Sequence, residues 1–196
     1  MEDLNNLIDR LTIGDGRGMG TEIEIRGYAA DLEKEIERLK YKSKSENLLV
    51  SEDVVNTLRC LKKLGVKHDV LIVSAHRTPH RLYQFAINAH KHYSVICAGA
   101  GRAAHLAGMC ASLLKKKLPV IGVPIKDKKS DGIAALFSTN EMPSGVPVAT
   151  TAIDGGTNAG LIAASIIALQ DKKVAMRLEK FRSKLTKSVR KKPKKR

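Results

Sequence analysis

The sequence predicts an α/β protein with a parallel, three-layer sheet. Short apolar, β-branched runs alternate along the chain with longer helical segments, which is typical of parallel strands buried on both faces. The composition agrees, because 43% of the residues are hydrophobic but only 4% are aromatic, and Trp is absent. We therefore expect a core of aliphatic and small side chains, which suits close packing of helices on a sheet. A chain of 196 residues fits one such domain.

The alternation begins with a helix over 51–64, in which Val54, Leu58 and Leu61 share one face and which Gly65 ends. A strand at 70–73 follows, and then a helix over 79–90 that begins with a proline. The later elements are a strand at 95–98, a helix at 103–114, a strand at 120–123, a helix at 132–138, a strand at 148–152 and a helix at 158–169. A last helix, 171–189, is expected to leave this body.

Residues 1–46 contain no strand long enough to start a sheet. An amphipathic helix is predicted over 28–44, where Leu32, Ile36 and Leu39 form one stripe. The glycine-rich stretch 14–20 lacks the preceding buried strand and the spacing of a phosphate-binding fingerprint, so we interpret it as a flexible loop.

The cysteines and the hydropathy exclude several classes of protein. Cys60, Cys97 and Cys110 lie in apolar contexts without metal-type spacing, which predicts buried free thiols in a reducing compartment. No apolar stretch reaches the 18 residues that a membrane span needs, and no signal-peptide core follows the first methionine. We therefore expect a soluble, cytoplasmic protein without a membrane partner.

The net charge of +15 is concentrated at the C-terminus. Residues 171–196 hold 13 Lys and Arg against two acids, and the run 190–196 has no apolar residue except a proline. This basic tail is predicted to be disordered. We interpret it as a solvated tail with incidental, nonspecific affinity for polyanions. The alternatives are a segment that contacts RNA, DNA or an anionic membrane, and a nuclear localisation signal. No aromatic residue is available there to stack on bases.

The candidate site lies at the ends of two consecutive predicted strands. The first strand runs into Ser74, His76 and Arg77, and the second runs into the small-residue loop 98–104 and then His105. Because ligands of parallel sheets collect beyond the carboxyl ends of the strands, these residues describe one pocket. Its chemistry combines a proton-transfer group, His76, with a fixed cation, Arg77, that faces bare backbone.

These motifs resemble the class I N5-carboxyaminoimidazole ribonucleotide mutases. The resemblance runs from about residue 47 to 189 and also includes the stretches 118–124, 142–148, 158–159 and 177–182, in the family's order. It implies a flavodoxin-like sheet over 47–170, a C-terminal helix over 171–189 that reaches a neighbouring subunit, and a homo-oligomer, in this family an octamer. The remaining parts are a divergent extension, 1–46, and the basic tail, 190–196.

The resemblance also implies the chemistry. The family moves a carboxylate from an exocyclic nitrogen to ring carbon 4 of an aminoimidazole ribonucleotide in purine biosynthesis, and it uses no metal or cofactor. Carbamate loss gives a trapped CO2, which then adds to the ring carbon. His76 matches the family's general acid/base, and imidazole suits this role because it gains and loses a proton near neutrality.

Seven further positions match substrate-binding residues of that family. Arg77 offers bidentate donors to a phosphate. Ala100 and Gly101 let the backbone approach the planar ring closely. Ser74 is expected to line the site, where its hydroxyl can serve the substrate or the loop, and His105 either belongs to the site or makes structural hydrogen bonds at a helix start. The other matching residues are Ala104 and Leu106.

The chain departs from the family where the substrate phosphate should be held. The family's Gly-Ser-x-Ser-Asp loop has no counterpart in residues 46–53, where Ser51 and Asp53 match only loosely. The strand before it is reduced to three apolar residues, for which residues 22–25 are the candidate replacement. Arg102 stands where the family has glycine. Three functions therefore remain open: an active mutase, a degenerate paralogue with a structural or assembly role, and a polyanion-binding protein that acts through the tail.

Overall fold

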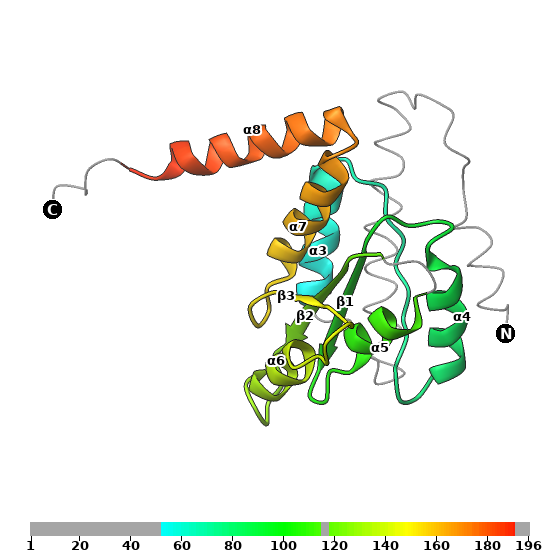
Figure 1. Ribbon diagram of the computed structural model, residues 1–196. Helices are drawn as coiled ribbons and strands as arrows, with labels where there is room; N and C mark the ends of the chain where they lie inside the picture. Colours follow the sequence, from blue (N-terminus) through cyan, green and yellow to red (C-terminus); the bar gives the residue numbers. More distant parts are fainter. Residues whose placement is uncertain (1–51, 115–117, 191–196) are drawn as a thin grey trace, which may run out of the picture. The chain divides into compact units, whose positions relative to one another are not determined.

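Three parallel strands form the sheet, in the order β1-β2-β3 (Figure 1). The computed structural model describes residues 52–114 and 118–190, and all elements below lie within them. The strands are β1 (Ile96–Gly101), β2 (Val120–Ile125) and β3 (Ala149–Thr150). Ile96 pairs with Val120, and Ile121 pairs with Ala149. The prediction of an α/β fold with a parallel sheet is confirmed.

Six helices surround or extend this sheet within the described residues. They are α3 (Glu52–Lys63), α4 (Pro79–Ala89), α5 (Leu106–Leu113), α6 (Ile133–Asn140), α7 (Gly156–Ala168) and α8 (Lys172–Ser188). The start of α4 at Pro79 and the end of α3 before Gly65, which has φ +66°, agree with the sequence. The helix after β1 begins at Leu106 instead of 103, because residues 102–105 form a turn.

Alternate residues of the central strand face two separate cores. Ile121 and Val123 pack with α3 and α7 in a cluster that includes Leu61, Leu64 and Ala163. Val120 points to the opposite face, where a second cluster joins β1 to α4 and α5. Helix α6 covers the same face. Gly122 faces this side, like Val120, and a Cβ added to it would collide with Thr139 of α6 and lie 3.0 Å from Val148 Cγ1. The result is a helix–sheet–helix sandwich.

Small residues allow the helices to approach closely, as the composition predicted. In α7, a Cβ at Gly160 would lie 2.8 Å from Cys60 Cβ and 3.1 Å from the Thr57 carbonyl oxygen. The hydroxyl of Thr57 donates to the Gly156 carbonyl across the same contact, over 2.9 Å. The junction between α3 and α7 therefore depends on a glycine in the middle of a helix.

The predicted strand at 70–73 is not formed within the described residues. Residues 66–74 belong to no helix or ladder in the described part of the chain, and Leu71 is 39% exposed. In a flavodoxin-like order the first strand lies between this segment and β1. Residues 47–50, which would provide that strand, lie outside the described residues, as do the predicted helix at 28–44, the loop at 14–20, the candidate strand at 22–25 and the tail 191–196.

Helix α8 is anchored at its beginning and free beyond it. The Asp171 carboxylate caps the helix by accepting from the backbone N–H of Lys173, over 2.8 Å, and of Val174, over 3.2 Å. Val174 and Leu178 are buried in the core on the α7 side, whereas residues 182–190 are exposed, and the helix extends away from α7 (Figure 1). Over the described part of the chain, no helix combines the length and apolar character that a membrane crossing needs.

Candidate functional site

The two histidines at the carboxyl edge of the sheet touch each other. His76 lies in a turn between the extended segment and α4, and His105 is the N-cap residue of α5, directly after β1. The Nε2 atom of His76 is 2.9 Å from the Nδ1 atom of His105. The ring centroids are 5.0 Å apart and the ring planes are inclined by 79°, so the contact is edge-on. Both side chains are exposed to solvent.

This contact holds one proton between two bases. A neutral imidazole has one N–H donor and one acceptor nitrogen, so one ring donates and the other accepts. The hydrogen bond is lost when both facing nitrogens carry protons, because two N–H donors then oppose each other. The 2.9 Å contact is therefore one in which a single N–H lies between the two ring nitrogens.

The turn that carries His76 is held by Ser74 and Thr78. The Thr78 hydroxyl accepts from the Ser74 backbone N–H, over 2.8 Å, and donates to the Ser74 carbonyl, over 3.1 Å. The Ser74 hydroxyl accepts from the backbone N–H of Arg77, over 3.1 Å. Of the two roles open to Ser74, the structure therefore provides the loop contact. Thr78 was not among the residues selected from the sequence, although a threonine before a helix-starting proline is a typical cap signal.

Arg77 extends from this turn into solvent. Its side chain is exposed, and its guanidinium has no hydrogen-bond or ion-pair partner within residues 52–114 and 118–190. A guanidinium offers five donors in a planar fork, which matches the oxygens of a phosphate or carboxylate. The group beside His76 is therefore free to bind an anion.

The end of β1 is bare, as expected. Ala100 is half-buried and Gly101 is exposed. A Cβ at Gly101 would lie 3.4 Å from the Ile125 carbonyl oxygen, an ordinary contact, so packing within the described residues does not demand glycine there. Ala104 is buried and Leu106 packs against the α4–α5 core, so these two residues also fill space behind the site.

Comparison with known proteins decides the family. The model of the AIR carboxylase family matches residues 43–188, which include every element described above. The chain belongs to the AIR carboxylase family. This agrees with the resemblance found in its motifs.

Several members of this family are similar over most of their length. The N5-carboxyaminoimidazole ribonucleotide mutase of Thermotoga maritima is 45% identical over 130 residues, which cover 66% of this chain and 75% of that protein. The Haemophilus influenzae protein of the same name is 49% identical over 132 residues, covering 66% of this chain and 79% of that protein. The phosphoribosylaminoimidazole carboxylase of Saccharomyces cerevisiae is 50% identical over 122 residues, but these are only 21% of its length.

Solved structures support the fold. Treponema denticola PurE matches with a TM-score of 0.59 and 24% identity, covering 69% of this chain and 84% of that one. A single-residue variant of PurE2 from the same organism, also 24% identical and with the same coverage of both chains, gives a TM-score of 0.61. The flavodoxin-like α/β fold expected for an AIR carboxylase relative is therefore confirmed.

Arg102, where the motif resemblance implies a glycine, has a left-handed backbone conformation. Its φ is +59°, in the left-handed region that non-glycine residues rarely adopt. A glycine would adopt this conformation at the end of β1 without steric cost, whereas this chain has an exposed arginine there.

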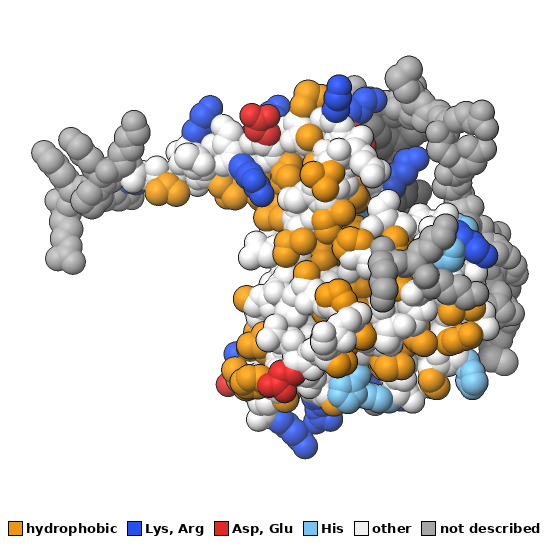
Figure 2. All heavy atoms as spheres, in the orientation of Figure 1, with side chains coloured by type: hydrophobic (Ala, Val, Ile, Leu, Met, Phe, Trp, Pro, Cys, Tyr) orange, Lys and Arg blue, Asp and Glu red, His pale blue; other side chains and the backbone are white. Residues whose placement is uncertain are grey.

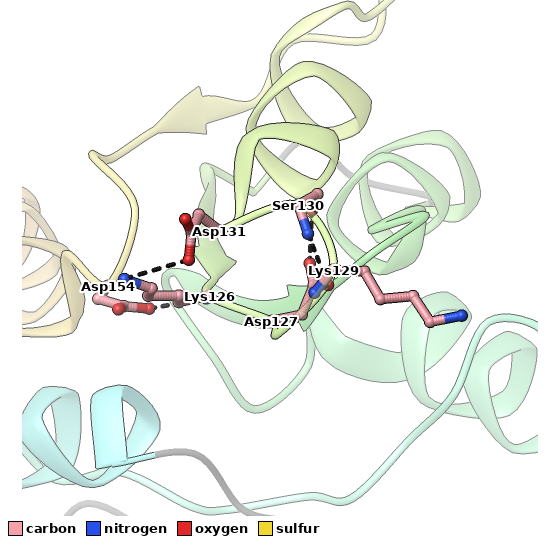
Figure 3. Close-up of polar contacts among 6 residues, drawn as sticks. All are labelled: Lys126, Asp127, Lys129, Ser130, Asp131 and Asp154. Atoms are coloured by element: carbon pink, nitrogen blue, oxygen red, sulfur yellow. Dashed lines mark hydrogen bonds and ion pairs between the residues drawn. The ribbon is translucent and has the colours of Figure 1, made fainter.

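The guanidinium of Arg102 acts on Asp127, in the loop after β2. The pKa of the Asp127 carboxyl is lowered by hydrogen bonds from the Ser130 hydroxyl, over 2.6 Å, and the Lys129 backbone N–H, over 2.8 Å (Figure 3). The charge of Arg102 lowers it further, as the smallest of the causes. Neither residue was predicted to interact with the other. The positive charge of Arg102 is therefore felt, weakly, at the loop after β2.

The same edge is tied together by a second set of contacts. The Asp154 carboxylate accepts from the Lys126 backbone N–H over 2.8 Å, and Lys126 Nζ lies 3.3 Å from Asp131 (Figure 3). Asp154 thus joins the loop after β3 to the loop after β2, whereas the Asp131–Lys126 ion pair lies within the loop after β2. Within the described ranges, no three His, Cys, Asp or Glu side chains are arranged to hold a metal ion.

A cavity of about 630 Å³ lies between α7 and α8, and it shares no residue with the histidine pair. It is open to solvent and mostly apolar, with Arg182 at its α8 side. Figure 2 shows hydrophobic side chains gathered where α7 meets α8. Its lining residues are Thr151, Ala152, Asn158, Leu161, Ile162, Ser165, Ile166, Leu169 and Arg182.

The three cysteines are free thiols, as predicted. Cys60 and Cys110 are buried and Cys97 is half-buried. Burial raises the pKa of Cys97 to about 12, with a smaller effect from neighbouring Cys60, and burial raises the pKa of Cys110 to about 11. These thiols therefore stay protonated near neutrality and take no part in the chemistry of the site.

Proposed function

We propose that this chain catalyses the interconversion of N5-carboxyaminoimidazole ribonucleotide and 4-carboxy-5-aminoimidazole ribonucleotide in purine biosynthesis, in the cytoplasm. Relatives at 45–49% identity carry the name of this mutase. The observation that carries the proposal is the hydrogen-bonded pair His76–His105, followed in the chain by Arg77, whose guanidinium has no partner among the described residues. It combines a movable proton with an anion-binding group, which are the two things that the reaction requires.

His76 is proposed as the general acid and base. The reaction needs a proton at the departing nitrogen and the removal of one from ring carbon 4, and a single imidazole can perform both transfers. His105 is proposed as the residue that shares its proton, because their nitrogens are 2.9 Å apart. Carboxylate migrates as CO2 between the two steps, so the site must hold a small neutral molecule against bare backbone, for which Ala100 and Gly101 are suited.

The proposed substrate contacts differ from those of the family at the phosphate. Arg77 is the one anion-binding residue that is both expected from the motif and free within the described residues. Of the loose matches to the phosphate loop, Ser51 lies outside the described residues and Asp53 lies in the first turn of α3. We propose that Arg102 supplies part of the missing charge from the other side of β1. Ser74, Ala104 and Leu106 shape the site through the turn and the core behind it.

The chain is also proposed to act as a homo-oligomer, an octamer by its resemblance to the family. Leu169 is 84% exposed, Met176 62% and Val189 74%, and apolar surface of this kind beside an open cavity is typical of a subunit contact. The body 47–170 would then carry the site, and helix 171–189 would contribute to assembly.

The test is a mutase assay on the full chain with the two ribonucleotides as substrate and product. Measurable conversion that falls at least about a hundredfold in His76→Asn supports the proposal, because general acid–base groups contribute about that much or more. The exposed His80 is the matched control, and His80→Asn should retain the wild-type rate. A well-folded full chain without conversion would instead favour the degenerate, structural member of the family. For a polyanion-binding protein, affinity must fall steeply with salt and disappear when residues 190–196 are removed.

A further inference from the structure

We propose that helix α8 binds double-stranded nucleic acid through its phosphate backbone, independently of base sequence. The contact surface is a lysine stripe, which consists of Lys173, Lys180, Lys184 and Lys187. This binding function is separate from the mutase reaction and does not rest on it.

The helical period places these four lysines on one side of α8. They follow one another at spacings of seven, four and three residues. With about 3.6 residues per turn, positions at these spacings share a side of the helix, and a rise of about 1.5 Å per residue makes the stripe about 21 Å long. All four side chains are exposed, and Figure 2 shows Lys and Arg side chains along α8. The result is a straight row of cations on a helix that extends away from α7.

No acidic side chain of α8 neutralises the lysine stripe. Glu179 is the one acid within the helix, and none of the four lysines stands three or four residues from it. Glu179 therefore lies on another side of α8. Within residues 52–114 and 118–190, the lysines of the stripe form no ion pair. Their charge is available to an external anion.

Contacts at the base of α8 fix the direction in which the lysine stripe faces. Val174 and Leu178 are buried in the core on the α7 side. The Arg177 guanidinium donates to the carbonyl of Leu64, at the end of α3, over 3.3 Å. Because these contacts hold the helix from two sides, α8 cannot roll about its axis without breaking them. The stripe therefore stays turned to solvent.

Assembly through the apolar side of α8 leaves the lysine stripe accessible. Leu185 and Val189 are exposed and continue, at helical spacing, the side on which Val174 and Leu178 are buried. The stripe lies about a third of a turn away from that side. A subunit contact and a nucleic acid can therefore use different sides of the same helix.

The chemistry of the lysine stripe favours a duplex over other anionic partners. Protein interfaces are depleted in lysine and depend on aromatic and arginine anchors. An amphipathic helix binds a membrane by inserting its apolar face, but Val174 and Leu178 of that face are buried in the protein's own core. Single strands are held by stacking on aromatic rings, and the one aromatic residue of α8, Phe181, already lies 5.1 Å from Lys63 Nζ. A duplex requires only cations, because it presents one phosphate charge per about 1.7 Å of its axis.

The experiment measures binding of a fluorescein-labelled DNA duplex to the full chain by fluorescence anisotropy over a series of KCl concentrations. The stripe variant carries Lys173→Gln, Lys180→Gln, Lys184→Gln and Lys187→Gln. The control variant has the same net charge, because it carries the same change at four exposed lysines of the body, Lys67, Lys91, Lys128 and Lys129. Residues 191–196 are present in both variants, so the difference between them reports on the lysine stripe.

We expect the slope of log K against log salt concentration to be shallower by about 3–4 in the stripe variant than in the wild type, since each phosphate contact contributes about 0.9. Affinity should be at least about tenfold weaker than in the control variant. A second duplex of unrelated sequence should bind the wild type equally well. The double variant at Lys184 and Lys187, which lie beyond the anchored part of α8, should change the slope by about 2.

Two results would overturn the proposal: a stripe variant that binds the duplex as tightly as the control variant, or a wild type that binds phosphatidylserine vesicles more tightly than the duplex. Circular dichroism verifies that the variants keep the helix, which is expected because glutamine and lysine have similar helix propensities. No step of this experiment depends on turnover. A chain without mutase activity can still bind the duplex, so the two proposals fail separately.

Discussion

Replacing Arg102 separates the role of its backbone from that of its charge. The residue has φ +59°, a backbone conformation that glycine adopts without steric cost but that strains a residue with a Cβ. Arg102→Ala removes the guanidinium but keeps the Cβ, whereas Arg102→Gly removes both. The difference in stability between the two variants therefore isolates the cost of a side chain in this turn.

The expected difference follows from two opposing effects. A Cβ in the left-handed region costs about 1–2 kcal/mol, which glycine relieves. Glycine also gives the unfolded chain more freedom, which lowers stability by about 0.4–1 kcal/mol. We therefore expect Arg102→Gly to be more stable than Arg102→Ala by roughly 0.5–1 kcal/mol.

Urea unfolding followed by far-ultraviolet circular dichroism measures this difference, since the chain has no Trp to report by fluorescence. The matched control is Lys128, an exposed loop residue without positive φ, where alanine should be at least as stable as glycine. An Arg102→Ala variant as stable as Arg102→Gly would refute the left-handed backbone at this position. In the mutase assay both variants should raise KM alike, because both lose the same charge.

Three further predictions concern packing, pH and assembly. Gly160→Ala should lower the free energy of unfolding by about 1–2 kcal/mol, since the new Cβ meets fixed atoms of α3. Gly108→Ala should lower it less, because there the Cβ meets the mobile end of the Met142 side chain. The urea concentrations at the unfolding midpoints of the two variants and the wild type measure this difference. Stability should fall as the pH rises above 9, because folding holds the Cys97 proton up to a pKa of about 12 and the Cys110 proton up to about 11. Each thiol contributes up to roughly 1.4 kcal/mol per pH unit below its folded pKa, so Cys97→Ala should remove its share of the slope. Leu169→Asp should lower the oligomer mass in light scattering, and an unchanged mass would contradict its place in a subunit contact.

The sequence was sufficient for features that depend on local pattern. Apolar spacing located α3, and Pro79 and Gly65 located helix ends, because these residues act through their own backbone. The order of the motifs also identified the family. The strand predicted at 70–73 has no ladder partner in the described part of the chain, because residues 47–50, its expected neighbour, lie outside it.

The features that were missed depend on contacts between distant segments. Nothing in the local sequence of His76 or His105 specifies that their nitrogens lie 2.9 Å apart, and this follows only from the placement of two turns at one sheet edge. The effect of Arg102 on Asp127 likewise arises from neighbouring strands. Thr78 was available as a cap signal, but its bonds to Ser74 form outside the helix it precedes.

The most direct test of the central claim is the kcat of His76→Asn in the interconversion of the two carboxylated aminoimidazole ribonucleotides, measured alongside ligand affinity in the same variant. The account predicts that kcat falls at least about a hundredfold while the substrate dissociation constant stays close to that of the wild type, because His76 moves the proton and Arg77 holds the anion. Near-normal turnover in this variant would remove His76 from the mechanism and contradict the account.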